Sequence, residues 1–192
     1  MMQEVIANIQ SGKYEDVLAA VQSPVIALTE LIKNASDSCQ NNEDPIYVKI
    51  DTIQKIITIT DSGRGFSKED LDRLGEAGYS SKMVGNYTRS PIDNPLAGSK
   101  GLGLLTAFFI ADILEIETYS QSDRKSYFLE WKKGAQKYNY EEIESESVGT
   151  VVTLKNVAPE KLQMILLPEE KVKILWRHFV SSQIIKTCPK SS

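Results

Sequence analysis

The stretch ALTELIKNASDSC, residues 27–39, constrains the fold more than any other part of the sequence, because as a helix it has two chemically different faces. At about 100° per residue, three polar side chains fall within about 60° of one another: Glu30, Asn34 and Asp37. Three apolar side chains fall on the opposite side: Leu28, Ile32 and Ala35. The apolar face needs a second layer to cover it. The polar face is either solvated, as charged helix faces usually are, or points into a site.

Patterns before and after this helix predict a sheet that it can cover. A further helical pattern runs from Tyr14 and is interrupted at Ser23-Pro24, where serine can cap and proline can begin the next helix. Five short stretches have the β-branched composition or partial alternation of strands: 46–51, 55–61, 112–118, 125–131 and 149–156. The first two are expected to form a hairpin. This order predicts an α+β fold in which helices lie on a mostly antiparallel sheet.

Three further helices and one long loop complete the prediction. Ser67 and Asp70 have the spacing of a capping box and are expected to start a short helix. Residues 101–111 are typical of a buried helix opened by glycines, and a proline begins a C-terminal helix predicted over 168–186. Residues 76–100 contain repeated Gly, Pro, Ser and Asn with no sustained period, which is typical of a functional or mobile loop.

Length and composition predict one domain over residues 1–192 that does not enter a membrane. The sequence is 41% hydrophobic and 25% charged, which is close to the average of globular proteins. No stretch approaches the roughly 18 consecutive apolar residues of a membrane span. The N-terminus lacks the basic and apolar regions of a signal peptide, so we expect a cytoplasmic protein.

Charge and cysteine content argue against several classes of site. Lys and Arg total 22 against 26 for Asp and Glu, so the net charge of −4 does not indicate a nucleic-acid binder. Cys39 and Cys188 are far apart, and a single histidine accompanies them, which is too little for a Cys/His metal site or a disulfide framework. That histidine, His178, is expected to be a helical surface or half-buried side chain rather than a catalytic group.

The segment DSGRG places an acid at the end of a predicted strand and two glycines directly after it. Asp61 can accept a hydrogen bond, and Gly63 and Gly65 allow the backbone to approach a ligand closely. A simple turn is the alternative.

The segment GSKGLGL brings three glycines to the entrance of an apolar helix: Gly98, Gly101 and Gly103. Free backbone N–H groups and the positive end of a helix dipole suit such a segment to binding phosphate. One glycine pattern of this kind arises by chance too often to decide the function. All three motifs in this order arise by chance much less often than one of them alone.

Taken together, ELIKNASD, DSGRG and GSKGLGL resemble, in order and spacing, the three nucleotide-binding boxes of the GHKL ATPase superfamily. This superfamily includes gyrase B-type topoisomerases, heat-shock chaperones, sensor histidine kinases, MutL and the MORC proteins. The resemblance covers about residues 25–155, and Gly149-Thr150 resembles a closing Gly-Thr element of the family. GYSSK, residues 78–82, resembles the stretch before the lid in MutL- and MORC-like members.

The resemblance implies the Bergerat fold, a two-layer sandwich of helices on a mixed, mostly antiparallel sheet. ATP would be held between the helices and a lid formed by residues 76–100. Hydrolysing members commonly use a lysine from a following transducer domain, and no such domain is visible here. We therefore expect the chain to be a fragment of a larger protein, the alternative being that a partner supplies the missing group.

The resemblance also implies a role for each polar residue of the boxes. Glu30 would be the general base that activates the attacking water, and Asn34 would give its side-chain oxygen to Mg²⁺. Asp37 would line the pocket, and Asp61 would accept a hydrogen bond from the adenine amino group. Thr150 would support that contact directly or through a water.

The remaining positions carried over from the family are mainly glycines and lysines. Gly63 and Gly65 would make room for the nucleotide. The residues that would surround the phosphates are Gly98, Ser99, Lys100, Gly101, Leu102 and Gly103. Lys82 is a further phosphate candidate. For both lysines a solvated loop side chain is the alternative, and Arg64 is expected to face solvent or to pair with an acid.

The function implied is Mg²⁺-dependent ATP binding and hydrolysis that drives conformational change or dimerisation in a homodimer or larger assembly. A histidine-kinase-type domain that transfers phosphate to a partner is one alternative, and a nucleotide sensor without hydrolysis is another. Glu30 favours hydrolysis, because sensor kinases usually lack a water-activating role at this helix. ATP and ADP are the expected ligands, and nucleic acid would be reached only through other domains.

Overall fold

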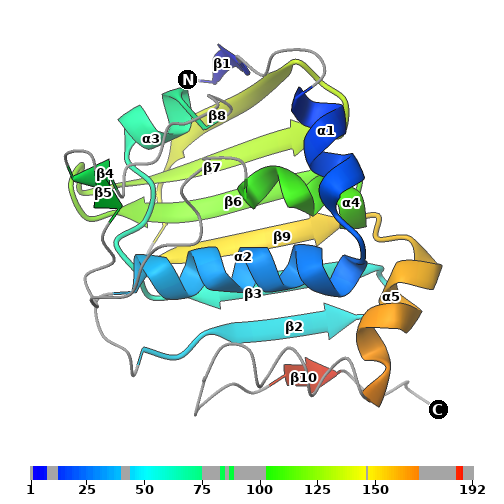
Figure 1. Cartoon of the computed structure of the whole chain (residues 1–192). Helices are drawn as coiled ribbons and strands as arrows, with labels where there is room; N and C mark the ends of the chain where they lie inside the picture. Colours follow the sequence, from blue (N-terminus) through cyan, green and yellow to red (C-terminus); the bar gives the residue numbers. More distant parts are fainter. Residues whose placement is uncertain are drawn as a thin grey trace.

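The computed structural model places a layer of helices on one face of a large sheet (Figure 1). It describes residues 2–7, 13–39, 44–74, 83–84, 87–88, 103–145, 147–168 and 185–187. All statements below concern these residues.

The main sheet has eight strands, and all but one of its neighbouring pairs are antiparallel. In spatial order the strands are β1 (Gln3–Ile6), β8 (Lys137–Ile143), β7 (Lys125–Lys132), β6 (Ile113–Ser120), β9 (Thr150–Lys155), β3 (Ile56–Asp61), β2 (Tyr47–Asp51) and β10 (Ile185–Thr187). Strand β10 pairs with β2 in parallel. A separate two-stranded ribbon consists of β4 (Met83–Val84) and β5 (Tyr87–Thr88). The predicted mixed, mostly antiparallel sheet is confirmed.

The helices are short except for α2, which lies in front of β3 and runs along it (Figure 1). They are α1 (Lys13–Ala20), α2 (Pro24–Ser38), α3 (Lys68–Asp72), the 3-10 helix η1 (Gly103–Thr106), α4 (Ala107–Ile110) and α5 (Pro159–Leu166). Helix α2 contacts strand β3 and the helices η1, α4 and α5. It is therefore the centre of the helical layer.

Local chemistry explains where α2 begins and which side it buries. The Ser23 hydroxyl accepts a hydrogen bond from the Ile26 N–H at 3.2 Å, and proline occupies the first turn, as predicted. Leu28 and Ile32, on the predicted apolar face, are 1% and 0% exposed. Burial of each such side chain stabilises the fold by roughly 1.5–3 kcal/mol. The predicted polar face is half-buried rather than fully solvated.

The sheet presents alternating residues to this helical layer. In β3, Ile57 and Ile59 are buried and are followed at the same spacing by Asp61, which is 5% exposed. In β9 the alternating buried positions begin with Thr150, and in β6 the buried Leu114 and Ile116 are followed at the same spacing by Thr118. A polar group thus occupies a core-facing position near one end of each of three adjacent strands, and each of these groups needs a hydrogen-bond partner.

Most of the locally encoded elements match their prediction. The hairpin β2–β3 is present, and Ser67 and Asp70 form the capping box at the start of α3. The predicted helix over 101–111 is, within its described part, a 3-10 turn followed by a single α-helical turn. Of the predicted loop 76–100, the described residues are those of β4 and β5.

Six of the described elements were not predicted, and one prediction is wrong in part. The unpredicted elements are β1, the ribbon strands β4 and β5, and also β8, α5 and β10. The C-terminal helix predicted over 168–186 is wrong at its end, because residues 185 and 186 belong to β10. Their backbone bonds to β2, a partner more than 130 positions earlier that no local pattern reveals. Residues 169–184 lie outside the described part of the chain.

No helix within the described ranges is both long and apolar enough to cross a membrane.

We predict that Ile32→Ala lowers the free energy of unfolding by about 2–5 kcal/mol, because it leaves a cavity between α2 and the sheet. The matched control is Ile53→Ala in the β2–β3 turn, where the side chain is 66% exposed and the change should stay within about 0.5 kcal/mol. Urea denaturation followed by circular dichroism measures both. Equal losses for the two variants would contradict the packing described for α2.

Candidate functional site

The polar face of α2 brings the first predicted motif to the surface of the helical layer. Glu30 and Asn34 are one helical turn apart, and Asp37 follows on the same side. All three are half-buried. Among the described residues, none forms a hydrogen bond or an ion pair with the Glu30 carboxylate. That carboxylate is thus available to a group from outside this part of the chain.

The last glycine of GSKGLGL lies directly against this face. A Cβ atom placed on Gly103 would lie 3.0 Å from Asn34 Nδ2, so a larger residue would press on the Asn34 amide. The Thr106 hydroxyl donates to the Gly103 carbonyl oxygen at 2.7 Å and lies 3.3 Å from the Ala27 carbonyl oxygen of α2. The start of η1 is therefore held beside α2, and two of the predicted motifs meet.

Asp61 occupies the end of β3 below the last turn of α2. Its Oδ1 atom accepts hydrogen bonds from the Gly63 N–H at 2.8 Å and from the Ser38 hydroxyl at 3.0 Å. A Cβ atom on Gly63 would lie 2.6 Å from the Ser38 carbonyl oxygen, too close for any other residue type at this position. Gly63, which is predicted to make room for the nucleotide, allows the loop after β3 to pass under α2 in this structure.

Thr150 lies beside Asp61 because β9 pairs with β3 in a register that sets the two residues opposite each other. The Thr150 hydroxyl is 3.0 Å from the Thr118 hydroxyl of β6. Thr118 is fully buried, and its oxygen also accepts a hydrogen bond from the Phe66 N–H at 3.0 Å. Thr118 was not predicted as a site residue. The sequence feature that could have identified Thr118 is a polar side chain at a core-facing position of an alternating strand.

Two further glycines allow the segments around Asp61 to pack closely. Gly65 has φ +72°, and a Cβ atom there would overlap the Tyr119 carbonyl oxygen. Gly149 has φ +80°, and a Cβ atom there would overlap the Asp61 carbonyl oxygen. Both backbones are in the left-handed region, which glycine adopts without strain. The Gly-Thr element is thereby placed against the end of β3.

The loop that follows Asp61 is tied down at several points. The Arg64 N–H donates to the Ser38 carbonyl oxygen at 3.2 Å, and the Gln121 amide donates to the Gly63 carbonyl oxygen at 3.3 Å. Arg64 also pairs with Asp70 at 3.9 Å, which confirms the prediction that it pairs with an acid. The Arg64 side chain is 42% exposed, whereas that of Asp70 is buried.

The structure thus gathers Glu30, Asn34, Asp37, Asp61, Gly63, Gly65, Gly103 and Thr150 around the polar face and the C-terminal end of α2. The other predicted phosphate-binding residues lie outside the described part of the chain: Lys82, Gly98, Ser99, Lys100, Gly101 and Leu102.

The residues present fit a magnesium ion bound together with a ligand rather than a closed metal site. The described segments hold no group of three His, Cys, Asp or Glu side chains that could bind a metal. Magnesium usually takes one or two oxygen ligands from the protein and the rest from phosphate and water. The Asn34 side-chain oxygen, half-buried beside Gly103, is suited to that role.

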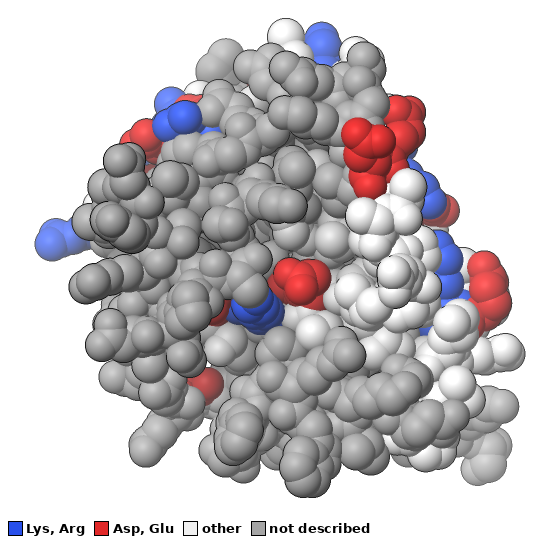
Figure 2. All heavy atoms as spheres, in the orientation of Figure 1, with Lys and Arg blue, Asp and Glu red and all other residues white. Residues whose placement is uncertain are grey.

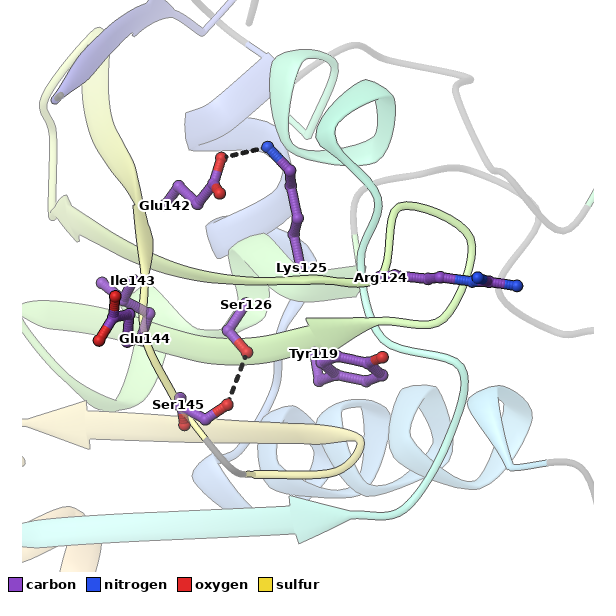
Figure 3. Close-up of a pocket in the computed structure, with 8 residues that line it drawn as sticks. All are labelled: Tyr119, Arg124, Lys125, Ser126, Glu142, Ile143, Glu144 and Ser145. Atoms are coloured by element: carbon purple, nitrogen blue, oxygen red, sulfur yellow. Dashed lines mark hydrogen bonds and ion pairs between the residues drawn. The ribbon is translucent and has the colours of Figure 1, made fainter.

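A groove of about 530 Å³ lies elsewhere, beside the ends of strands β6, β7 and β8 (Figure 3). Its lining residues are Tyr119, Arg124, Lys125, Ser126, Glu142, Ile143, Glu144 and Ser145. Lys125 and Glu142 pair at 2.7 Å, and the Ser126 hydroxyl donates to the Ser145 carbonyl oxygen. None of the predicted site residues lines this groove, so it is distinct from the site at α2.

Charged side chains of both signs are scattered over the face of the molecule that carries α2 (Figure 2). The described part of this face has no broad basic area of the kind that binds a nucleic-acid backbone.

Comparison with known proteins places this fold and site in one class. The family described as histidine kinase-, DNA gyrase B-, and HSP90-like ATPase matches residues 22–161, which is most of the chain and includes all the described residues of the site. The chain belongs to this family, which is the GHKL superfamily whose boxes the motifs resemble.

Individual relatives are chaperones named HtpG. The chain is 31% identical to the HtpG of Clostridium acetobutylicum over 176 residues, covering 80% of this chain and 28% of that protein. It is 31% identical to a Campylobacter jejuni HtpG over 148 residues, with 67% and 24% coverage. For the Bacillus velezensis HtpG the identity is 29% over 147 residues, with 68% and 23% coverage. The chain thus spans about a quarter of each relative. These relatives do not single out the MutL- and MORC-like members.

We predict that Gly65→Ala destabilises the protein more than Gly134→Ala does. Both residues have positive φ, +72° and +74°, so each variant carries a similar backbone cost of about 1–2 kcal/mol. An added Cβ at Gly134 meets no atom within 4 Å, whereas at Gly65 it collides with β6 and should cost about 1–3 kcal/mol more. Urea denaturation measures the difference. Similar losses would show that Gly65 is not tightly packed.

Proposed function

We propose that the chain binds ATP together with Mg²⁺ and hydrolyses it. One observation carries this proposal: Gly103 lies against Asn34, and Asp61 with Thr150 lies at the end of the same helix. From Glu30 to Ser38 the helix rises by about 12 Å, at about 1.5 Å per residue. A phosphate site near Glu30, in the middle of α2, and an adenine site near Ser38, at its C-terminal end, would therefore be separated as the ends of one nucleotide are.

The adenine end would be recognised by Asp61. Its carboxylate lies 5% exposed at the end of β3, where an acceptor can meet the amino group of adenine. Guanine has a carbonyl oxygen at the corresponding position, and two acceptors facing each other repel. Thr150, opposite Asp61 in β9, would add a second polar contact. The proposed site selects adenine over guanine for this reason.

The phosphate end would be formed by the glycine segment that ends at Gly103, by Asn34 and by Glu30. When bound, Mg²⁺ would neutralise charge on the phosphate oxygens, with Asn34 as its ligand from the protein. The Glu30 carboxylate would orient the attacking water and accept its proton. Its lack of a hydrogen-bond or ion-pair partner among the described residues is consistent with this role.

The HtpG relatives suggest what hydrolysis would serve. They are named as chaperones, and the chain aligns with about a quarter of their length. We therefore propose that this domain couples its nucleotide state to conformational change or dimerisation of a larger cytoplasmic assembly. Phosphate transfer to a histidine and nucleotide sensing without hydrolysis are the competing functions. ATP hydrolysis that depends on Glu30 would distinguish the proposed function from both of these alternatives.

We predict that Glu30→Ala lowers the rate of phosphate release by about 10²- to 10⁴-fold, the usual contribution of a general base, while ATP binding is retained. Glu15→Ala is the control, because Glu15 is an exposed glutamate on α1, outside the site. A colorimetric phosphate assay measures the rates, and calorimetry measures binding. Equal release by wild type and Glu30→Ala would exclude Glu30 as the base.

We predict that Asp61→Asn weakens ATP binding by about 1.5–3 kcal/mol, the contribution of a hydrogen bond to a charged group. Asparagine keeps an oxygen for the Gly63 N–H but replaces the other oxygen with an amino group, which cannot accept from adenine. The control is Asp112→Asn at an exposed position. Calorimetry that gave wild-type affinity for Asp61→Asn would contradict the adenine assignment.

We also predict that the wild-type protein is stabilised by ATP and much less by GTP. At about 100 times its dissociation constant, ATP should raise the free energy of unfolding by about 2.7 kcal/mol. A thermal-shift titration with ATP, ADP and GTP measures this selectivity. Equal shifts with ATP and GTP would argue against Asp61 as the base-selecting residue.

A further inference from the structure

Ser38, the last residue of α2, makes a contact that neither the motifs nor the comparisons assign. Its hydroxyl oxygen lies 3.0 Å from Asp61 Oδ1 and 2.7 Å from the Ala35 carbonyl oxygen. A serine hydroxyl has a single proton, so it cannot donate fully to both acceptors at once. Which acceptor receives the proton decides what Ser38 does.

The surroundings favour donation to Asp61. A carboxylate is the stronger acceptor, because hydrogen bonds to an ionised group are about twice as strong as neutral ones. The Ala35 carbonyl has a second donor, the Cys39 thiol at 3.3 Å. Burial, reinforced by the nearby Asp61 charge, raises the pKa of the Cys39 thiol to about 11, so that thiol keeps its proton at neutral pH. The Ala35 carbonyl is thus satisfied when Ser38 donates to Asp61.

Donation from Ser38 fixes the orientation of the Asp61 carboxylate. Oδ1 then receives two donors from different elements, the Gly63 N–H of its own loop and the Ser38 hydroxyl of α2. Rotation of the carboxylate would break both hydrogen bonds together. The Ser38 carbonyl oxygen also accepts the Arg64 N–H, so the same residue holds the loop through its backbone.

We propose that Ser38 is a positioning residue for base recognition: its hydroxyl holds the Asp61 carboxylate in the orientation that accepts the amino group of adenine. The proposal rests on the ATP-binding function proposed above. Ser38 acts through Asp61 and does not itself contact the reacting phosphate. A purely structural role at the end of α2 would instead affect all nucleotides equally.

Two ligands that differ only in the amino group separate these roles. We would measure the dissociation constants of ATP and of purine riboside triphosphate, which has hydrogen in place of that amino group, by calorimetry on wild type and Ser38→Ala. We expect Ser38→Ala to weaken ATP binding by about threefold to tenfold, the scale of one hydrogen bond. Binding of purine riboside triphosphate should change less than twofold.

The ratio of the two dissociation constants is taken on one protein preparation, so any general loss of folded protein cancels. Ser36→Ala on the same helix is the control, since it keeps the backbone carbonyl that accepts the Cys39 N–H and should leave the ratio unchanged. An equal loss of affinity for both ligands, or no loss for either, would overturn the proposal for Ser38. If wild type bound neither ligand, the proposed function itself would fail, which is a separate outcome.

Discussion

The packing of helix α2 on the inner face of the sheet is the constraint on which the rest of the site depends. The buried side chains of α2, such as Leu28 and Ile32, fix its height and rotation above β3. The sheet register then places Asp61 opposite Thr150, and Thr118 opposite Thr150 on the next strand. A slip of one residue in either pairing would turn these polar groups to the other face of the sheet. Apolar burial and strand register therefore position the polar groups of the site.

The site also requires that backbone segments from different parts of the chain approach one another closely, and glycines make this possible. Gly63 lets the loop after β3 pass below Ser38, and Gly149 lets the Gly-Thr turn lie against the end of β3. Gly103 lets the start of η1 approach Asn34. In the first and last of these contacts a glycine from a distant segment faces a polar atom of α2. A ligand lying along α2 from Glu30 to Ser38 would contact both segments, and an adenine nucleotide with its metal ion is the ligand that we propose for it.

Local patterns predicted the features that depend on local physics. The two faces of α2, the cap at Ser23, the β2–β3 hairpin and the capping box of α3 follow from spacing and propensity, and all are present. Strands β1, β8 and β10 depend on partners far away in the sequence. In β8, Tyr138 and Tyr140 are buried by contacts with α3, where their hydroxyls bind the Leu71 carbonyl and the Asp72 carboxylate. Ser38 and Thr118 escaped prediction for the same reason, since the partner of each hydroxyl lies on a distant segment.

A crystal structure with a non-hydrolysable ATP analogue and Mg²⁺ tests the central claim most directly. We expect the adenine amino group within hydrogen-bond distance of the Asp61 carboxylate, the metal ion on the Asn34 side-chain oxygen, and phosphate oxygens beside Gly103. The Glu30 carboxylate should face the terminal phosphate through a water molecule. An analogue bound away from α2, for example in the groove beside Tyr119, or a soaked crystal with no nucleotide along α2, would contradict it.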